Sequence, residues 1–212
     1  MKTATQKIIV SSMLAALTCV ATMIIKIPSP LHGYLNLGDG IVLLAGWMLS
    51  PMYGFLSAGL GSALADILSG YIAYAPATFM IKGLMAVIAF YGFKLFRKKN
   101  GKLSSRIISG TAAEIMMILG YFVFEGFLYG FVPSLVNIPA NGIQGGAGLI
   151  IGIVLVKVFE KQNIFYQGSC DESSTGRDVK SKIRQRVHLQ DQRPPLRGQL
   201  LADTCERQAR EA

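Results

Sequence analysis

Charged residues are scarce in this 212-residue chain, in which 51% of the residues are hydrophobic and 16% are charged. An ordinary soluble domain has about 25% charged residues. A water-soluble fold could not cover its surface with so few charges, so residues 1–165 are predicted to form a membrane-embedded body. The composition also excludes a disordered or collagen-like chain. The only acids of this body are Asp39, Asp66, Glu114, Glu125 and Glu160.

Sequence patterns that carry catalysis are also missing. Cys19, Cys170 and Cys205 are too few and too scattered for a disulfide or zinc framework. The chain has no phosphate-binding GxxxxGK[ST] loop, no HExxH and no GxSxG. We therefore expect no enzymatic activity, no catalytic residue, no metal site and no intrinsic cofactor. The net charge of +9 does not favour nucleic acid, because no basic stripe is interleaved with aromatic residues.

Long apolar runs, in contrast, recur along residues 1–165. A hydrocarbon core about 30 Å thick needs about 20 apolar residues in a helix. The first run could be a signal peptide, but the further runs downstream favour a retained helix. Ser50-Pro51 divides one long run in two, because proline fits the first turn of a helix and disrupts an interior. An all-α membrane protein with six transmembrane helices is predicted, with spans at about 8–25, 35–49, 51–69, 76–96, 105–131 and 138–159.

The distribution of basic residues predicts the orientation of these spans. With six spans and the N-terminus inside, the basic residues at span ends fall almost entirely on the cytoplasmic side, Lys26 excepted. This agrees with the positive-inside rule. Both termini are therefore expected to be cytoplasmic. Residues 166–212 lack a helical apolar period and contain many charges, which indicates a disordered tail, either native or artefactual.

Ionisable residues within the spans are costly in a bilayer and usually face a cavity or a partner. At about 1.5 Å per residue, most of those in this chain fall in one layer within about 10 Å of the outer surface. One layer favours a pocket open to the outside, while ion pairs such as Asp66–Lys82 or Glu125–Lys82 could instead only fix helix packing. Glu114 alone lies deeper. Polar groups from five predicted helices make up this layer: the ionisable Asp39, Asp66, Lys82 and Glu125, and the amides Asn141 and Gln144.

Several tyrosines are expected at the same level, either as an interfacial aromatic belt or as stacking partners for a flat ligand. They are Tyr34, Tyr71, Tyr74, Tyr121 and Tyr129.

Small residues recur on the first predicted span, which permits close helix approach. This face either packs within the monomer or docks another membrane protein. Its residues are Ser11, Ser12, Ala15, Ala16 and Cys19.

Five segments together resemble the substrate-specific S component of energy-coupling factor (ECF) vitamin transporters, and most of all the riboflavin-type branch. The resemblance covers roughly residues 5–162. The segments are Gly33–Asp39, Gly61–Asp66, Ala75–Leu84, Tyr121–Gly126 and Asn137–Asn141 with Gln144.

That resemblance implies a multi-pass protein of a prokaryotic cell membrane that binds one vitamin with high affinity, riboflavin first and hydroxymethylpyrimidine or another small vitamin second. It also implies a complex with a transmembrane T component and two ATPases, with the small-residue face of the first helix towards the T component. The alternatives are a ligand-free assembly protein and a stand-alone secondary carrier. The implied substrate-binding residues are Asn36, Asp39, Asp66, Tyr74, Lys82, Tyr121, Glu125, Asn137, Asn141 and Gln144.

Overall fold

The structure is a computed structural model that describes residues 4–24, 26–28 and 34–161. All of these residues fall in one compact unit. The tail predicted for residues 166–212 lies outside the described residues and stays a prediction.

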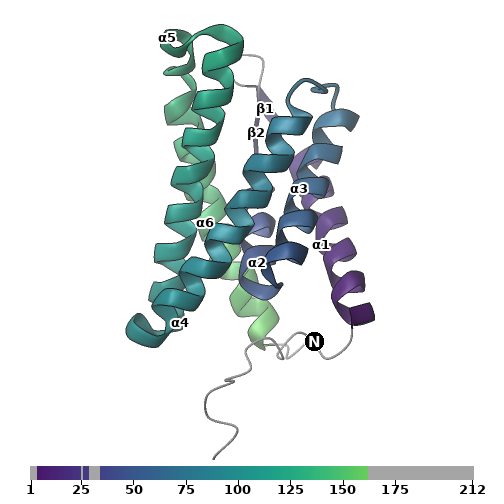
Figure 1. The fold of residues 1–212 in the computed structure, drawn as a ribbon, viewed down its shortest axis with the longest axis vertical. Helices are drawn as coiled ribbons and strands as arrows, with labels where there is room; N and C mark the ends of the chain where they lie inside the picture. The colour runs from purple at the N-terminus through teal and green to yellow at the C-terminus, as the bar shows by residue number, and fades with distance from the viewer. Residues whose placement is uncertain (1–3, 25, 29–33, 162–212) are drawn as a thin grey trace, which may run out of the picture. The chain divides into compact units, whose positions relative to one another are not determined.

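Helices make up nearly all of the described chain, and one short antiparallel strand pair joins the first two of them (Figure 1). In chain order the elements are α1 (Ala4–Ile24), β1 (Lys26–Pro28), β2 (Tyr34–Asn36), α2 (Asp39–Met48), α3 (Pro51–Leu68), α4 (Ala75–Tyr129), α5 (Phe131–Ser134) and α6 (Asn137–Lys161).

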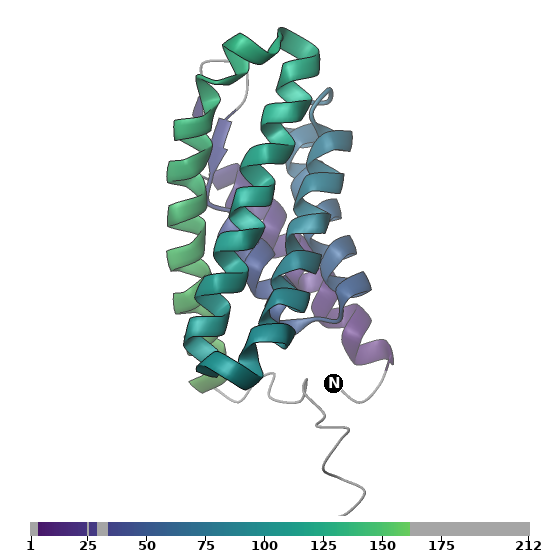
Figure 2. The same cartoon turned by 60° about the vertical axis from the view of Figure 1, so that its left-hand side comes forward.

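Proline and glycine set the helix limits. Pro51 occupies the first turn of α3, where its missing N–H costs no hydrogen bond. Gly101 has φ 75° and ψ 169°, a conformation that favours glycine, and it divides α4 into a first leg, residues 75–100, and a second leg, residues 102–129. The two legs run in opposite directions (Figure 2). Gly130, with φ 93°, ends the second leg. The predicted breaks near residues 50, 100 and 132 are therefore confirmed.

The second predicted span differs from the structure. Residues 34–36 form β2, paired with β1 in the register Lys26↔Asn36, and the helix begins only at Asp39. Ten residues of helix reach about 15 Å, half the thickness of a hydrocarbon core. Within the described part of the chain, three helical stretches are long and apolar enough to cross a membrane, Thr5–Ile24, Ala75–Tyr129 and Phe131–Glu160.

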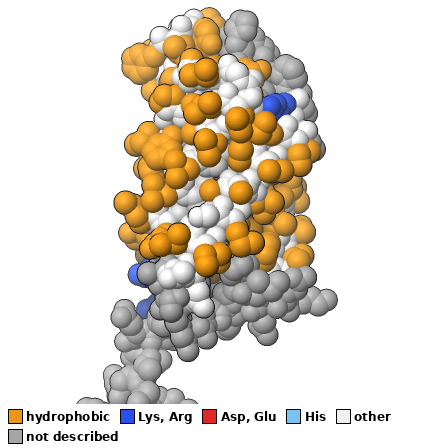
Figure 3. Space-filling view, turned by 90° about the vertical axis from the view of Figure 1, so that its right-hand side faces the viewer, with side chains coloured by type: hydrophobic (Ala, Val, Ile, Leu, Met, Phe, Trp, Pro, Cys, Tyr) orange, Lys and Arg blue, Asp and Glu red, His pale blue; other side chains and the backbone are white. Residues whose placement is uncertain are grey.

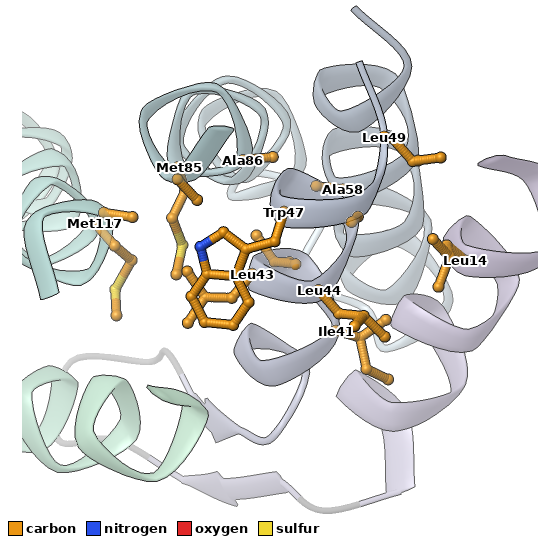
Figure 4. Close-up of a cluster of buried hydrophobic side chains, with 14 of the residues drawn as sticks. Leu14, Ile41, Leu43, Leu44, Trp47, Leu49, Ala58, Met85, Ala86 and Met117 are labelled. Atoms are coloured by element: carbon orange, nitrogen blue, oxygen red, sulfur yellow. The ribbon is translucent and has the colours of Figure 1, made fainter. Parts of the chain in front are cut away.

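α2 forms the centre of the core. Its residues from Asp39 to Trp47 are all buried, and it contacts α1, α3, α4 and α6. Figure 4 shows Trp47 and Leu43 of α2 beside Met85 and Met117 of the two legs of α4. The Trp47 indole N–H also donates to Ser109 Oγ at 3.0 Å, which joins α2 to the second leg.

The outer surface of the bundle is apolar. Large side chains such as Met13, Leu95, Phe127 and Ile143 are each more than 60% exposed. Figure 3 shows one face of the bundle, on which hydrophobic side chains extend over most of its length and charged ones are few. A soluble monomer rarely exposes so continuous an apolar surface. Together with the long apolar helices, this surface identifies a membrane protein.

Candidate functional site

A polar cavity lies between α1, β2, α3, both legs of α4 and α6. It holds about 510 Å³ of space between its side chains, part of it open to solvent. Apart from Asp39, every residue predicted from the sequence to bind substrate lines this cavity. The lining residues are Thr22, Asn36, Ser62, Asp66, Tyr71, Tyr74, Thr78, Lys82, Tyr121, Glu125, Asn137, Asn141 and Gln144.

Lys82 and Asp39 form a fully buried ion pair at the cavity wall. Asp39 occupies the first turn of α2, where the helix dipole favours a negative charge. Its second oxygen accepts a hydrogen bond from Gln144 Nε2 at 2.7 Å. The sequence leaves Asp66 and Glu125 open as ion-pair partners of Lys82, and in the structure Lys82 pairs with Asp39. The second predicted span begins at residue 35, which places Asp39 one turn inside a helix, whereas α2 begins at Asp39 itself.

The strand pair brings a further polar group to the cavity. The Asn36 backbone N–H donates to Gln144 Oε1 at 3.0 Å, and Asn36 Oδ1 accepts from the Gly38 N–H at 3.0 Å. Gln144 therefore bridges β2 and the Asp39 carboxylate, with its amide oxygen accepting and its amide nitrogen donating. An amide held by both its oxygen and its nitrogen fixes the position of α6 against the start of α2.

A second polar pair, Glu125 with Asn137, lies between the second leg of α4 and the start of α6. Asn137 Nδ2 donates to Glu125 Oε1 at 2.9 Å, and both residues are buried. The other carboxylate oxygen, Glu125 Oε2, has no hydrogen-bond partner among the described residues. A buried acceptor left in this state is costly, so it is available to a ligand donor.

Aromatic rings form another part of the wall. Tyr74 is buried and makes an edge contact with Phe124, with ring centroids 5.2 Å apart. The Tyr121 hydroxyl lies 3.1 Å from Thr78 Oγ1, and Lys82 Nζ lies 5.6 Å from the Tyr121 ring centroid. Of the five tyrosines expected at one level, Tyr71, Tyr74 and Tyr121 line the cavity. The side chain of Tyr34 lies outside the described residues.

Sequence reasoning did not select the hydroxyl residues Thr22, Ser62 and Thr78, which also line the cavity. A single Ser or Thr in an apolar helix bonds its own backbone as readily as a ligand, so its identity alone carries little information. The oxygens of Thr22 and Ser62 are buried without a hydrogen-bond partner among the described residues. In the same part of the chain, no group of three or more His, Cys, Asp or Glu residues is placed to hold a metal ion.

Glu114 lies outside the cavity lining. It is 5% exposed, and it packs against α6 at Gly145 and Gly148.

The small residues of α1 divide between two faces. Ser11 is buried, and a Cβ added to Gly61 of α3 would overlap the Ala15 carbonyl oxygen, so this side packs within the bundle. Ser12 and Ala16 are exposed and lie one turn apart, while Cys19 is half-buried. The structure therefore leaves Ser12 and Ala16 accessible to another membrane protein, and the partner role of this face stays a prediction.

Comparison with known proteins identifies the family. The family described as "ECF-type riboflavin transporter, S component" matches residues 2–161. A curated relative, "Uncharacterized protein in gap 3'region" of Pyrococcus woesei, is 33% identical over 144 residues, which cover 68% of this chain and 94% of the relative.

Two solved structures share the fold. A structure described as the S component of a bacterial ECF transporter has a TM-score of 0.59 at 24% identity, and the match covers 76% of this chain and 99% of that one. The S component for biotin of an ECF-type ABC transporter has a TM-score of 0.56 at 19% identity, and the match covers 80% of this chain and 97% of that one. The family match over residues 2–161 is decisive: this chain belongs to the ECF-type riboflavin transporter S components, vitamin-binding subunits of transporters.

Proposed function

We propose that the chain binds riboflavin in the cavity and presents it to a transmembrane T component driven by two ATPases. The observation that carries this proposal is the cavity itself, in which buried polar groups from five helical segments and one strand converge. Ligand sites typically combine an apolar body with a few placed polar groups. Here the rings of Tyr71, Tyr74 and Tyr121 supply apolar surface, and the other lining side chains supply the polar groups.

The chemistry of the wall favours a flat, neutral ligand with hydrogen-bond donors. Tyr71, Tyr74 and Tyr121 offer ring faces or edges for stacking. Glu125 Oε2 is a buried acceptor that a ligand N–H or O–H would satisfy. The positive charge of Lys82 is already neutralised by Asp39, so the wall offers no unbalanced cation to attract an anionic substrate. Riboflavin fits this pattern, and hydroxymethylpyrimidine or another small vitamin is the second candidate.

For the membrane arrangement we propose six crossings with both termini in the cytoplasm of a prokaryotic cell. The start of α1, the Gly101 turn and the end of α6 lie at the same end of the bundle (Figures 1 and 2). The Gly101 turn carries Arg97, Lys98, Lys99 and Lys102, which the positive-inside rule assigns to the cytoplasm. The second crossing would combine α2 with the strand pair, because α2 alone is too short.

The family match supports a complex with other subunits, and the given sequence contains no phosphate-binding loop with which this chain could use ATP itself. The exposed Ser12 and Ala16 of α1 support a contact with the T component. Small residues let two helices approach closely within lipid, where apolar area alone gives little preference for a helix over lipid.

The test is to purify the full chain in detergent and identify any bound small molecule by mass spectrometry. Riboflavin should co-purify, or bind when added, with the visible absorption of a flavin. Glu125→Gln keeps an oxygen that can accept from Asn137 but removes the carboxylate charge, and it should weaken riboflavin binding. Glu160→Gln, far from the cavity, is the matched control and should bind as the wild type does. If hydroxymethylpyrimidine binds and riboflavin does not, the substrate is hydroxymethylpyrimidine.

Two other outcomes would overturn the proposal. If no vitamin in a panel binds and Glu125→Gln instead impairs folding, the buried polar pairs only hold the helices together, as in a ligand-free assembly protein. If the chain alone carries riboflavin across liposome membranes without any ATPase, it is a secondary carrier.

A further inference from the structure

Glu114 is a buried acid that the proposed binding function does not use. It lies on the second leg of α4 and is 5% exposed. Neither of its carboxylate oxygens has a hydrogen-bond partner among the described residues. Glu125, in contrast, accepts a hydrogen bond, and Asp39 has both a hydrogen bond and an ion pair. A buried carboxyl in this setting is strongly disfavoured as an anion.

The helix packed against Glu114, α6, offers no side chain that could donate a hydrogen bond to its carboxylate. A Cβ built on Gly145 would lie 3.0 Å from Glu114 Oε2, and one built on Gly148 would lie 3.0 Å from Oε1. α6 therefore presents two glycines to the carboxyl group, which bring the helix close but contribute no side-chain N–H or O–H. The Cβ built on Gly148 would also lie 2.6 Å from Asp39 Cβ, so the side chains of Glu114 and Asp39 both contact α6 at Gly148.

The local charges are unbalanced if Glu114 is ionised. Gly148 of α6 lies against both Glu114 and Asp39 of α2, and Asp39 pairs with Lys82 on the first leg of α4. At this place α6 itself contributes only Gly145 and Gly148. Asp39 and Lys82 already neutralise each other. An ionised Glu114 would add a second carboxylate to one buried ammonium group. A proton on Glu114 restores neutrality.

Lys82 connects this group to the cavity, because it lines the cavity and also pairs with Asp39. Asp66 and Glu125 line the cavity together with Lys82, whereas Asp39 holds Lys82 from beneath it. When Glu114 is ionised, it joins Asp39 in attracting Lys82 away from the cavity, and a ligand that accepts a hydrogen bond from Lys82 Nζ competes less well. The interaction is reciprocal, so ligand binding also strengthens the hold on the proton.

We propose that Glu114, Asp39 and Lys82 form a proton-binding site beneath the cavity, with the proton on Glu114 at neutral pH, and that loss of this proton weakens ligand binding. The ligand-dependent half of this inference rests on the proposed function, whereas the protonation state of Glu114 does not.

Infrared spectroscopy of the ligand-free protein tests the first half. The wild type at neutral pH should show the carbonyl stretching band of a protonated carboxyl group, and Glu114→Gln should lower its intensity. Glu160→Gln is the control and should leave the band unchanged, because Glu160 is held as an anion by two hydrogen bonds from Arg106. An unchanged band in Glu114→Gln would overturn the proposal. If that variant does not fold, Glu114→Met replaces it, since a neutral side chain without hydrogen bonds tolerates an apolar substitute.

Riboflavin affinity across a range from neutral to alkaline pH tests the second half. The wild type should bind roughly tenfold more weakly once Glu114 has lost its proton, within the usual range of coupling between two sites. Glu114→Gln should bind riboflavin as the wild type does at neutral pH and should lose this additional decline. A decline of the same size in the variant would refute the coupling. If riboflavin does not bind the wild type at all, the proposed ligand is wrong, while the infrared result still decides the proton site.

Discussion

Lys82→Met removes the ammonium group that pairs with Asp39 and keeps a long side chain in its place. Asp39 is fully buried and Lys82 is 1% exposed, so solvent does not reach the carboxylate left behind. Removing one partner of a buried ion pair costs about 3–5 kcal/mol. We therefore expect the free energy of unfolding to fall by about 4 kcal/mol.

Thermal unfolding of the ligand-free protein in one detergent, followed by circular dichroism, measures this effect. For a chain of this size, about 4 kcal/mol corresponds to a fall of roughly 10 °C in the unfolding temperature. The double variant Asp39→Asn with Lys82→Met removes both charges, keeps an oxygen that can accept from Gln144, and should recover most of the loss. The reasoning is refuted if the single variant unfolds at the wild-type temperature, or if the double variant is no more stable than the single one.

Three further changes test the partner face, the helix packing and the end of the bundle away from the cavity. Ser12→Trp with Ala16→Trp should leave vitamin binding unchanged but prevent co-purification with the T component and ATPases, because both positions are exposed on α1. Gly61→Ala should cost about 1–3 kcal/mol of stability, since its Cβ would overlap the backbone of α1. Glu160→Gln should cost about 1 kcal/mol, because the buried Arg106 loses an ionic partner that is itself 36% exposed.

Each of these changes has a control within the chain. Met13→Trp alters an exposed position beside the Ser12–Ala16 face and should leave the complex intact. Gly142→Ala adds a Cβ with no atom within 4 Å and should not destabilise the protein. Adding salt should reduce the difference between wild type and Glu160→Gln, because that pair is partly open to solvent. Loss of vitamin binding in the double tryptophan variant would show that the chosen face belongs to the fold.

The helix limits could be predicted because individual residues determine them. Pro51 cannot continue the preceding helix, and the break at Gly101 coincides with a run of basic residues that ends an apolar segment. The strands were not predicted, since Lys26–Pro28 and Tyr34–Asn36 have three residues each and are too short to show an alternating pattern. Their pairing moves the start of α2 to Asp39.

The residues of the cavity were predicted better than the contacts between them. The position of a residue along its helix gives its depth in the membrane, and similar depths predict that Asp66, Lys82 and Glu125 lie near one another. All three line the same cavity. The choice of Asp39 as the partner of Lys82 depends on how far each helix is rotated about its axis. Helix rotation is fixed by packing across the core, such as the close approach of Gly46 to Ala86, which sequence position alone does not reveal.

Trp47 gives the protein a fluorescent probe of its own, because it is the one tryptophan in the sequence. All tryptophan emission therefore originates from a single site at the centre of the bundle, where the indole is hydrogen-bonded to Ser109. Separation of α2 from the second leg of α4 would break that bond and admit polar surroundings, shifting the emission to longer wavelength. Movements of these two helices in a lipid membrane can thus be followed without attaching a dye.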